Sequence, residues 1–378
     1  MPEYGLGFWQ YKLRYQTQDE LLQVAREHKH RSLPVEVLPD PDSMIAEIRS
    51  LGIKLMVSIW PTVDARSKNH SQMLASGLLI RQDRGLRVSM GPRICNHFDV
   101  TNPAARRFVW DTAKRNYDDK GVRLFWLDEA EPEHSVYDFD IYRYHQRPEP
   151  HGFYEGMKSA GQDPVVNFVR CAWVGNQKYG ILLWSGDVAS SWSSFRNQLS
   201  AGLSAGIAGI SYNSDDVAFR ELFVRWFQWG AFCPVFRLHG DRLPQQQMLG
   251  HSGGSHCLSG APNELWSYGE EVYEICKMYL FLREKMRDYV REVLHVAHRH
   301  GDPVIRPLFY GLPEDERAWN VTDQSLFGRK VSRCAYSCGG AEEEEQERVG
   351  KVLEGGDTTT VDAPLEYMPV FELTEVTS

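Results

Sequence analysis

Short apolar runs alternate with longer segments of helical period from Gly5 to about His239. A short apolar run bounded by Gly, Pro or polar residues is typical of a buried strand, and apolar residues spaced three or four apart are typical of a helix. This pattern predicts eight strands, over residues 6–15, 33–38, 54–60, 122–127, 164–170, 181–184, 207–212 and 232–238. Eight strand–helix units within about 250 residues have the size of a TIM barrel. The predicted fold class is therefore α/β, with a (β/α)8 barrel.

Amphipathic segments between the strands predict the helices of the barrel. Residues 19–28 place Leu21, Val24 and Ala25 on one side. Residues 103–117 begin with a proline, whose missing N–H does no harm in a first turn. Further helices are predicted over 194–203 and 218–229.

A long helix, broken once, is predicted over residues 264–300, after the barrel. It ends with His295, His298 and His300. We interpret these as basic residues at a helix C-terminus and not as a metal cluster, because no nearby carboxylate completes a site.

The chain divides into four predicted regions. The final region alternates apolar and polar residues around Gly and Pro, as short strands do. The predicted regions are a catalytic barrel over 1–260, a post-barrel helix with the start of a β-domain over 261–328, an irregular acidic insert over 329–350, and the remnant of a C-terminal β-domain over 351–378.

Composition and charge exclude several classes of function. The 378 residues are 42% hydrophobic and 25% charged, as in an ordinary globular protein, and the formal net charge of −9 argues against a non-specific nucleic-acid binder. Nearly half of that charge, −4, comes from residues 341–350, with five Glu and one Arg. No apolar run is long enough to span a membrane. No secretory signal is visible, so the location is unknown, with the cytoplasm as the default expectation.

The cysteine and aromatic contents narrow the chemistry further. Seven Cys without CxxC pairs fit reduced thiols better than a disulfide framework or a zinc site, so no metal site is predicted. Trp, Tyr and Phe number 11, 17 and 17, and many Trp stand beside Asp, Gly or Pro. A flat ring covers the apolar face of a sugar while acids bind its hydroxyls. The alternative, ordinary core aromatics, holds for roughly half of them.

Acidic residues follow two predicted strands directly. One apolar strand ends in Asp128, which begins a run of four acids in six residues, and another ends in Asp187 after a Ser-Gly pair. Active sites of TIM barrels lie at these strand ends, and two carboxylates from different strands suit acetal hydrolysis. Helix caps or a magnesium or calcium site are the alternatives. The last strand ends in Arg237 and His239, which suit hydrogen bonds to a polyol, or equally an Arg–Asp pair and a capping histidine.

Three longer motifs carry a resemblance to a known family. The runs WLDEAEPE (126–133), RCAWVGNQKYGILLWSGD (170–187) and FRELFVRWFQWGAFCPVFRLHGDR (219–242) closely resemble glycoside hydrolase family 31. The segments GFWQYKLRY and NELWSYGEEVYEICKMYLFLRE look like its first strand and its post-barrel helix. The similarity covers about residues 5–328, and VLEGGDTTTVDAPLEYMPVF resembles the β-domain that follows the barrel.

The resemblance implies a retaining α-glycosidase that works by double displacement without a metal or organic cofactor. By resemblance, Asp128 matches the nucleophile and Asp187 the general acid/base. Burial and the nearby negative charge are then expected to raise the pKa of Asp187. The residues expected to bind the sugar are Trp60, Arg170, Trp184, Arg237 and His239.

The chain also departs from the family pattern. The loop expected after Leu38 is short, and the loop expected near 212–216 is missing, so its role is assigned to neither Asp215 nor Asp216. Residues 89–97 and 329–350 do not resemble the family. By comparison with the family pattern, we also expect no N-terminal β-domain before the barrel. The predicted architecture is therefore a shortened (β/α)8 TIM barrel followed by a partial C-terminal β-sandwich domain.

The predicted function is an exo-acting α-glycosidase that hydrolyses terminal α-linked glucose. Its expected partner is an oligosaccharide or glycoside, with no nucleic acid or membrane partner, and the oligomeric state is left open. The alternatives are an α-xylosidase of the same family, a catalytically impaired remnant that binds carbohydrate, and a chain that does not fold stably. Losing loops from a sugar subsite lowers kcat/KM by removing transition-state contacts.

Overall fold

The structure is a computed structural model. It describes residues 1–39, 45–80, 88–90, 93–128, 150–172, 175–207, 212–213, 220–244, 260–334 and 364–372.

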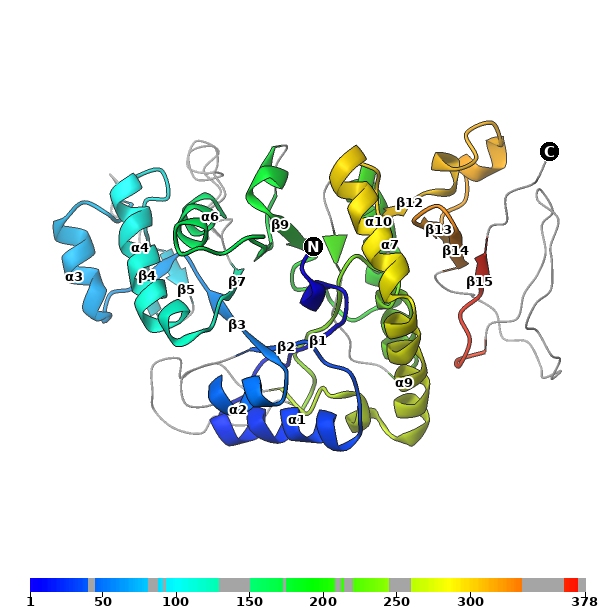
Figure 1. The fold of residues 1–378 in the computed structure, drawn as a ribbon, viewed down its shortest axis with the longest axis horizontal. Coiled ribbons are helices and arrows are strands. Elements are labelled where there is room, and N and C mark those ends of the chain that lie inside the picture. Colours follow the sequence, from blue (N-terminus) through cyan, green and yellow to red (C-terminus); the bar gives the residue numbers. More distant parts are fainter. Residues whose placement is uncertain are drawn as a thin grey trace.

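Eight parallel strands form the largest sheet (Figure 1). They are β1 (Phe8–Gln10), β2 (Val37–Pro39), β3 (Lys54–Ile59), β7 (Leu124–Leu127), β8 (Asn167–Val169), β9 (Ile181–Trp184), β10 (Tyr212–Asn213) and β11 (Phe236–Leu238). Their order in the sheet is β10-β9-β8-β7-β3-β2-β1-β11. From β1 to β10 the neighbours follow one another along the chain, and β11, the last strand, lies on the other side of β1. Between β10 and β11 no ladder is present among the described residues. The predicted barrel is confirmed, and each predicted strand overlaps an observed one.

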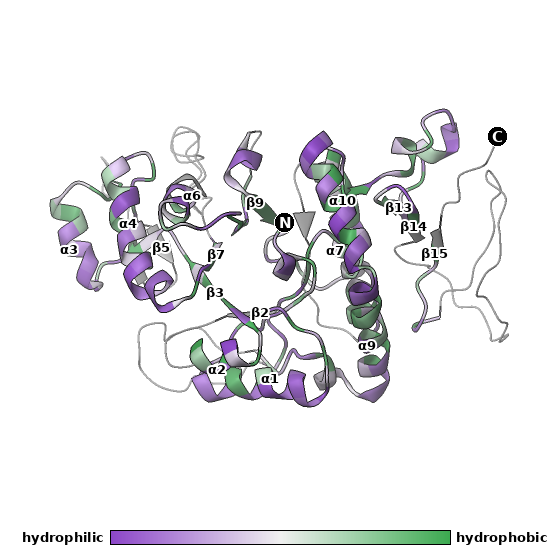
Figure 2. Ribbon diagram, in the orientation of Figure 1, coloured by the Kyte–Doolittle hydropathy of each residue, from purple (hydrophilic) through white to green (hydrophobic). Residues whose placement is uncertain are grey.

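Helices surround the strands and carry apolar residues on their inner sides. Figure 2 shows polar and apolar residues alternating along α1, α4 and α10, as amphipathic helices require. Local signals set their starts: the Thr17 side chain accepts from the Glu20 N–H, and the Asn102 side chain accepts from the Ala104 N–H. The helices are α1 (Gln18–His30), α2 (Ile45–Ser50), α3 (Lys68–Ala75), α4 (Pro103–Asn116), α6 (Pro150–Ser159), α7 (Trp192–Ile207), α8 (Arg220–Gly230), α9 (Glu270–Lys285) and α10 (Arg287–His300). Among the described residues, no helix is both long and apolar enough to cross a membrane.

Successive residues of each barrel strand face opposite sides, which divides the apolar residues between two cores. Phe8 and Phe125 pack outward against the helices, while their neighbours Trp9 and Trp126 pack inside the barrel. The inner core consists of Tyr4, Trp9, Val37, Met56, Leu124, Trp126, Phe168, Leu182, Trp184 and Val235. The barrel interior is therefore filled with large side chains, and a ligand must bind above them.

A small antiparallel sheet lies between β3 and α4 and was not predicted. Its strands are β4 (Thr62–Asp64), β5 (Val88–Met90) and β6 (Arg93–His97), in the order β4-β6-β5. Strands this short hold too few residues for an alternating pattern to be recognised. Because β4 begins two residues after Trp60, this sheet extends from the strand end where a site residue is predicted.

A second antiparallel sheet follows the barrel, in the order β12-β13-β14-β15. Its strands are β12 (Ile305–Arg306), β13 (Gln324–Phe327), β14 (Val331–Cys334) and β15 (Val370–Glu372). The expectation that residues 329–350 hold no regular element is wrong at their start, because β14 pairs with both β13 and β15. Residues 335–350, which include the acidic run, lie outside the described residues. The boundaries of the four predicted regions stay predictions.

The helix predicted over 264–300 consists of two helices joined at Met286. The predicted break is therefore present, but the regular helix begins later, at Glu270, after the 3-10 turn Leu265–Tyr268. Gly269 lies between this turn and α9, and it has a positive φ of 97°, a conformation that glycine adopts more readily than other residues.

Buried polar side chains on α8 hold the C-terminal segment 364–368. Arg225 donates to the carbonyl oxygens of Tyr367 at 3.0 Å and Pro364 at 3.1 Å. Gln228 donates to the carbonyl oxygen of Leu365 at 2.7 Å. These bonds satisfy carbonyl groups of residues that lie outside the described strands, and they attach residues 364–367 to the barrel.

Arg283 of α9 is fully buried and binds the backbone at the junction of β1 and β11. Its guanidinium donates to the carbonyl oxygens of Leu6 at 2.9 Å, Ala231 at 2.9 Å, Cys233 at 2.7 Å and Pro234 at 3.1 Å. The first of these residues precedes β1 and the other three precede β11. One side chain therefore joins the post-barrel helix to both strands.

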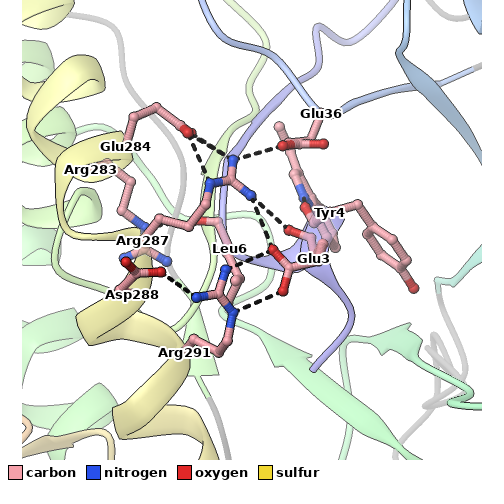
Figure 3. Close-up of polar contacts among 10 residues, drawn as sticks. Glu3, Tyr4, Leu6, Glu36, Arg283, Glu284, Arg287, Asp288 and Arg291 are labelled. Carbon is pink, nitrogen blue, oxygen red and sulfur yellow. Dashed lines mark hydrogen bonds and ion pairs between the residues drawn. The ribbon is translucent and has the colours of Figure 1, made fainter.

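A partly exposed ion-pair network on α10 extends this junction to the N-terminus (Figure 3). Arg287 pairs with Glu36 at 2.7 Å and with Glu284 at 2.8 Å. Arg291 pairs with Glu3 at 2.9 Å. Because these pairs are near water, each contributes little to stability compared with the bonds of Arg283.

Replacing Arg283 with Met is expected to lower the free energy of unfolding by about 3 kcal/mol or more, because several buried carbonyl groups lose their donor together. The matched control, Arg291→Met on the next helix, removes only partly exposed ion pairs and is expected to cost less than about 1 kcal/mol. Denaturant unfolding curves of both variants measure the difference. Equal losses would contradict the special role of Arg283.

Candidate active site

The residues predicted to form the site lie at or just beyond the carboxyl ends of the barrel strands. Trp60 follows β3, Asp128 follows β7, Arg170 follows β8, and Asp187 and His239 follow β9 and β11. The remaining two, Trp184 and Arg237, lie within β9 and β11. Because parallel strands end at one face of a barrel, these side chains face a common region. The contacts described below connect all of them.

Asp128 is nearly buried and is held on three sides. Its backbone N–H donates to the Ile59 carbonyl oxygen at 3.0 Å, which continues the ladder between β3 and β7. Its Oδ2 accepts a hydrogen bond from Trp60 Nε1 at 3.0 Å. Its Oδ1 lies 4.0 Å from Arg170 Nε. These contacts fix the direction of the carboxylate and offset its negative charge.

Asp187 is the more accessible carboxylate, with 67% of its side chain exposed. It follows Gly186, whose φ of 85° lies in the left-handed region that favours glycine. Its Oδ2 lies 3.6 Å from Arg170 Nη1, and its Oδ1 lies 3.8 Å from His239 Nε2. A carboxylate with this exposure can exchange protons with solvent or with a ligand above the barrel.

Arg170 connects the two carboxylates. Its side chain is only 9% exposed, and its guanidinium is within 4.0 Å of Asp128 and 3.6 Å of Asp187. The two acids come from different strands, β7 and β9, and Arg170 comes from β8 between them. The positive charge of Arg170 therefore stabilises both carboxylates at one end of the barrel, and the two acids need not contact each other.

A layer of aromatic rings lies beneath the charged groups. The His239 ring stacks on Tyr11, with centroids 4.7 Å apart, and meets the edges of Trp126 and Trp184 at 5.3 and 5.2 Å. Arg237 is buried among the same rings, with its guanidinium carbon 4.3 Å from the Trp126 centroid. Sequence reasoning missed the contact made by Tyr11. The alternation along the first strand, which places Trp9 and Tyr11 on one side, was the available signal.

The pKa of Asp187 is lowered, which contradicts the expectation that it is raised. The N–H of His239 that faces the carboxylate is the main cause, and the positive charges of Arg170 and Arg237 act in the same direction against burial. Burial and a second acid alone would raise this pKa. The groups that lower it lie within or just after β8 and β11, and spacing along the sequence does not show that these strand ends meet Asp187. Burial and the charge of Arg237 lower the pKa of His239 to about 3, so this histidine is neutral at neutral pH.

Several predicted acidic residues lie outside the described residues. They include Glu129, Glu131 and Glu133 of the run after β7, and Asp215 and Asp216. Among the residues that the structure does describe, no three His, Cys, Asp or Glu side chains are grouped as a metal ion would need.

Comparison with known proteins places the chain in a family. Residues 38–292 match the model of the glycosyl hydrolases family 31 TIM-barrel domain. The chain therefore belongs to glycoside hydrolase family 31.

Three similar proteins illustrate the relationship. An uncharacterized family 31 glucosidase ORF2 from Pseudescherichia vulneris is 49% identical over 289 residues, which cover 65% of this chain and 54% of that protein. An α-xylosidase from Saccharolobus solfataricus is 28% identical over 430 residues, covering 98% of this chain and 55% of that protein. The crystal structure of a GH31 α-xylosidase from a soil metagenome, complexed with xylose, superimposes with a TM-score of 0.92 at 42% identity, and covers 100% of this chain and 64% of that one. The chain thus spans a little over half to about two thirds of the length of these relatives.

The contacts of Asp187 predict its titration in the free protein. Its pKa is expected to lie below the ordinary value of 3.8. Replacing His239 with Leu is expected to raise that pKa, because the facing N–H is lost, whereas His239→Gln keeps an amide donor and is expected to leave it low. Carbon-detected NMR titration of the Asp side chains, assigned with Asp187→Asn, measures the pKa of Asp187 in the wild-type protein and in both His239 variants. A wild-type pKa above the ordinary value would contradict this electrostatic account.

Proposed function

We propose that this chain is a retaining α-glycosidase that removes a terminal α-linked sugar by double displacement. The observation that carries the proposal is the pair of carboxylates on separate strand ends, each within about 4 Å of the same guanidinium. A nucleophile and a proton donor on the two sides of a glycosidic bond are what retaining hydrolysis needs. Membership of family 31 supports the same chemistry.

In the first step, an Asp128 oxygen attacks the anomeric carbon while Asp187 gives its proton to the glycosidic oxygen. The bond to the leaving group breaks, and a covalent glycosyl ester forms on Asp128. In the second step, Asp187 takes a proton from water, and the water oxygen attacks the same carbon and releases Asp128. Two inversions leave the sugar with its original α configuration.

Binding of the sugar shifts Asp187 to its protonated form, which can act as a proton donor. In the free protein the His239 N–H and Arg170 favour the ionised carboxylate. Trp60, Arg170, Trp184 and His239 are the proposed sugar-binding residues, so a bound sugar hydroxyl takes the His239 N–H away from Asp187. Covering Asp187 also removes water from it. Both changes raise its pKa, so that Asp187 holds a proton when the glycosidic oxygen is in place.

Two sugars fit the proposal. Hydrolysis of terminal α-glucosides is the function expected from the sequence, and the 49% identical family 31 glucosidase supports it. An α-xylosidase activity is the second candidate, supported by the α-xylosidase structure that matches the whole chain. Glucose and xylose differ in the hydroxymethyl group, so paired aryl α-glucoside and α-xyloside assays distinguish the two candidates.

The roles of the two acids are separable with α-glycosyl fluorides, whose fluoride leaves without a proton donor. Asp128→Gly is expected to lose at least about 10³-fold in kcat/KM and to form the β-glycosyl azide when azide is added, because azide replaces the nucleophile. Asp187→Ala is expected to keep the first step and to form the α-glycosyl azide. NMR of the products identifies the anomer.

Two results would contradict the assignment: the same azide anomer from both Asp128→Gly and Asp187→Ala, or wild-type turnover that does not exceed that of Asp128→Asn. Sugar binding by calorimetry without turnover would support the carbohydrate-binding remnant. A thermal melt run on each protein, wild type included, separates loss of chemistry from failure to fold.

A further inference from the structure

Arg237 lies within β11 and His239 follows that strand, two residues further on, so both side chains face the barrel interior. Arg237 pairs in register with Trp9 of β1. Both side chains are buried, with 6% of Arg237 and 2% of His239 exposed. Arg237 Nη2 lies 3.2 Å from His239 Nδ1, within hydrogen-bond distance.

The direction of this hydrogen bond follows from the chemistry of the two groups. A guanidinium carries only donors, so His239 Nδ1 must be the acceptor. A neutral imidazole has one protonated nitrogen, and its proton must then lie on Nε2. That nitrogen is the one that faces Asp187 Oδ1, at 3.8 Å.

The surroundings of the ring leave it one orientation. Tyr11 stacks on one face at an interplanar angle of 24°, and Trp126 and Trp184 meet it nearly at right angles, at 89° and 88°. A flipped ring would place a C–H group against the Arg237 donor. Among the described residues, the charged groups that face the ring are Arg237 from β11 and Asp187 from beyond the end of β9, with Arg170 beyond Asp187.

We propose that Arg237 is a positioning residue, which fixes the Nε2-protonated tautomer of His239 so that this histidine presents an N–H to Asp187 and to the sugar. This inference rests on the proposed function. It also changes the role expected from the sequence, in which Arg237 touches the sugar. The other tautomer would turn a lone pair toward the Asp187 carboxylate, and the two would repel each other.

The position of Arg237 supports an indirect role. Its guanidinium carbon lies 4.3 to 5.6 Å from the ring centroids of Trp126, Phe168, Trp184 and Tyr11. Contacts with the ring faces favour a cation at this place. The cation also keeps the neighbouring imidazole neutral, because its charge and the burial of the ring both lower the pKa of His239.

The tautomer itself is measurable without any enzymatic activity. We expect NMR of protein labelled with ¹⁵N in its histidines, with the His239 signals assigned by His239→Gln, to show a proton on Nε2 only at neutral pH. In Arg237→Met a mixture of tautomers is expected, and in Arg237→Lys, which keeps a donor, the Nε2 form is expected to prevail. A proton on Nδ1 in the wild-type protein would overturn the inference, even if both variants failed to fold.

Kinetics then test whether Arg237 acts through His239. Arg237→Met is expected to lower kcat/KM roughly 10- to 100-fold, the effect of losing one oriented donor to a charged group. In a His239→Gln background, whose amide has no tautomers, the same change is expected to have little effect. Equal losses in both backgrounds would overturn the indirect role. If the wild type has no activity, the NMR result still decides the tautomer, so failure of the proposed function is distinguishable.

Discussion

The parallel pairing of β1 with β11 brings the two ends of the barrel sequence together. Its register sets Phe8 against Phe236, Trp9 against Arg237 and Gln10 against Leu238. The ladder continues past the strands, since the N–H groups of Tyr11 and Leu13 donate to the carbonyl oxygens of Leu238 and Gly240. A shift of one residue would turn every side chain of β11 to the opposite face. Arg237 and His239 reach the barrel interior only because this register holds. The buried guanidinium of Arg283 supports it by binding the backbone just before each of the two strands.

The charges at the mouth of the barrel depend on that arrangement. β7, β8 and β9 are neighbours, so Asp128, Arg170 and Asp187 alternate in sign across three strand ends. His239 joins them from β11, which is far along the sheet order, and its N–H contributes to the low pKa of Asp187. In a barrel these distant strands face one another across the top. The site therefore depends on tertiary closure as well as on local sequence.

Much of this fold could be predicted from the sequence, because buried parallel strands are apolar on both faces and are bounded by breakers. Asp128 and Asp187 are recognisable as candidate site residues for the same reason, since an acid at or close to the end of an apolar strand stands out in the sequence. The strands β4, β5 and β6 were missed because each is short, and β14 was missed beside an acidic run that indicated irregular structure. The packing of Tyr11 on His239 and the lowered pKa of Asp187 depend on contacts between distant strands, which spacing along the chain does not encode.

The most direct test of the account is the covalent intermediate on Asp128. Fluorinated α-glycosyl fluorides of glucose and xylose form this ester and slow its hydrolysis, because the added fluorine destabilises the positive charge of the transition state. Mass spectrometry of the treated protein is predicted to show a single added sugar, in the peptide that contains Asp128, and none in Asp128→Asn. A sugar attached to a different residue, or no adduct from a protein that hydrolyses α-glycosides, would contradict the account.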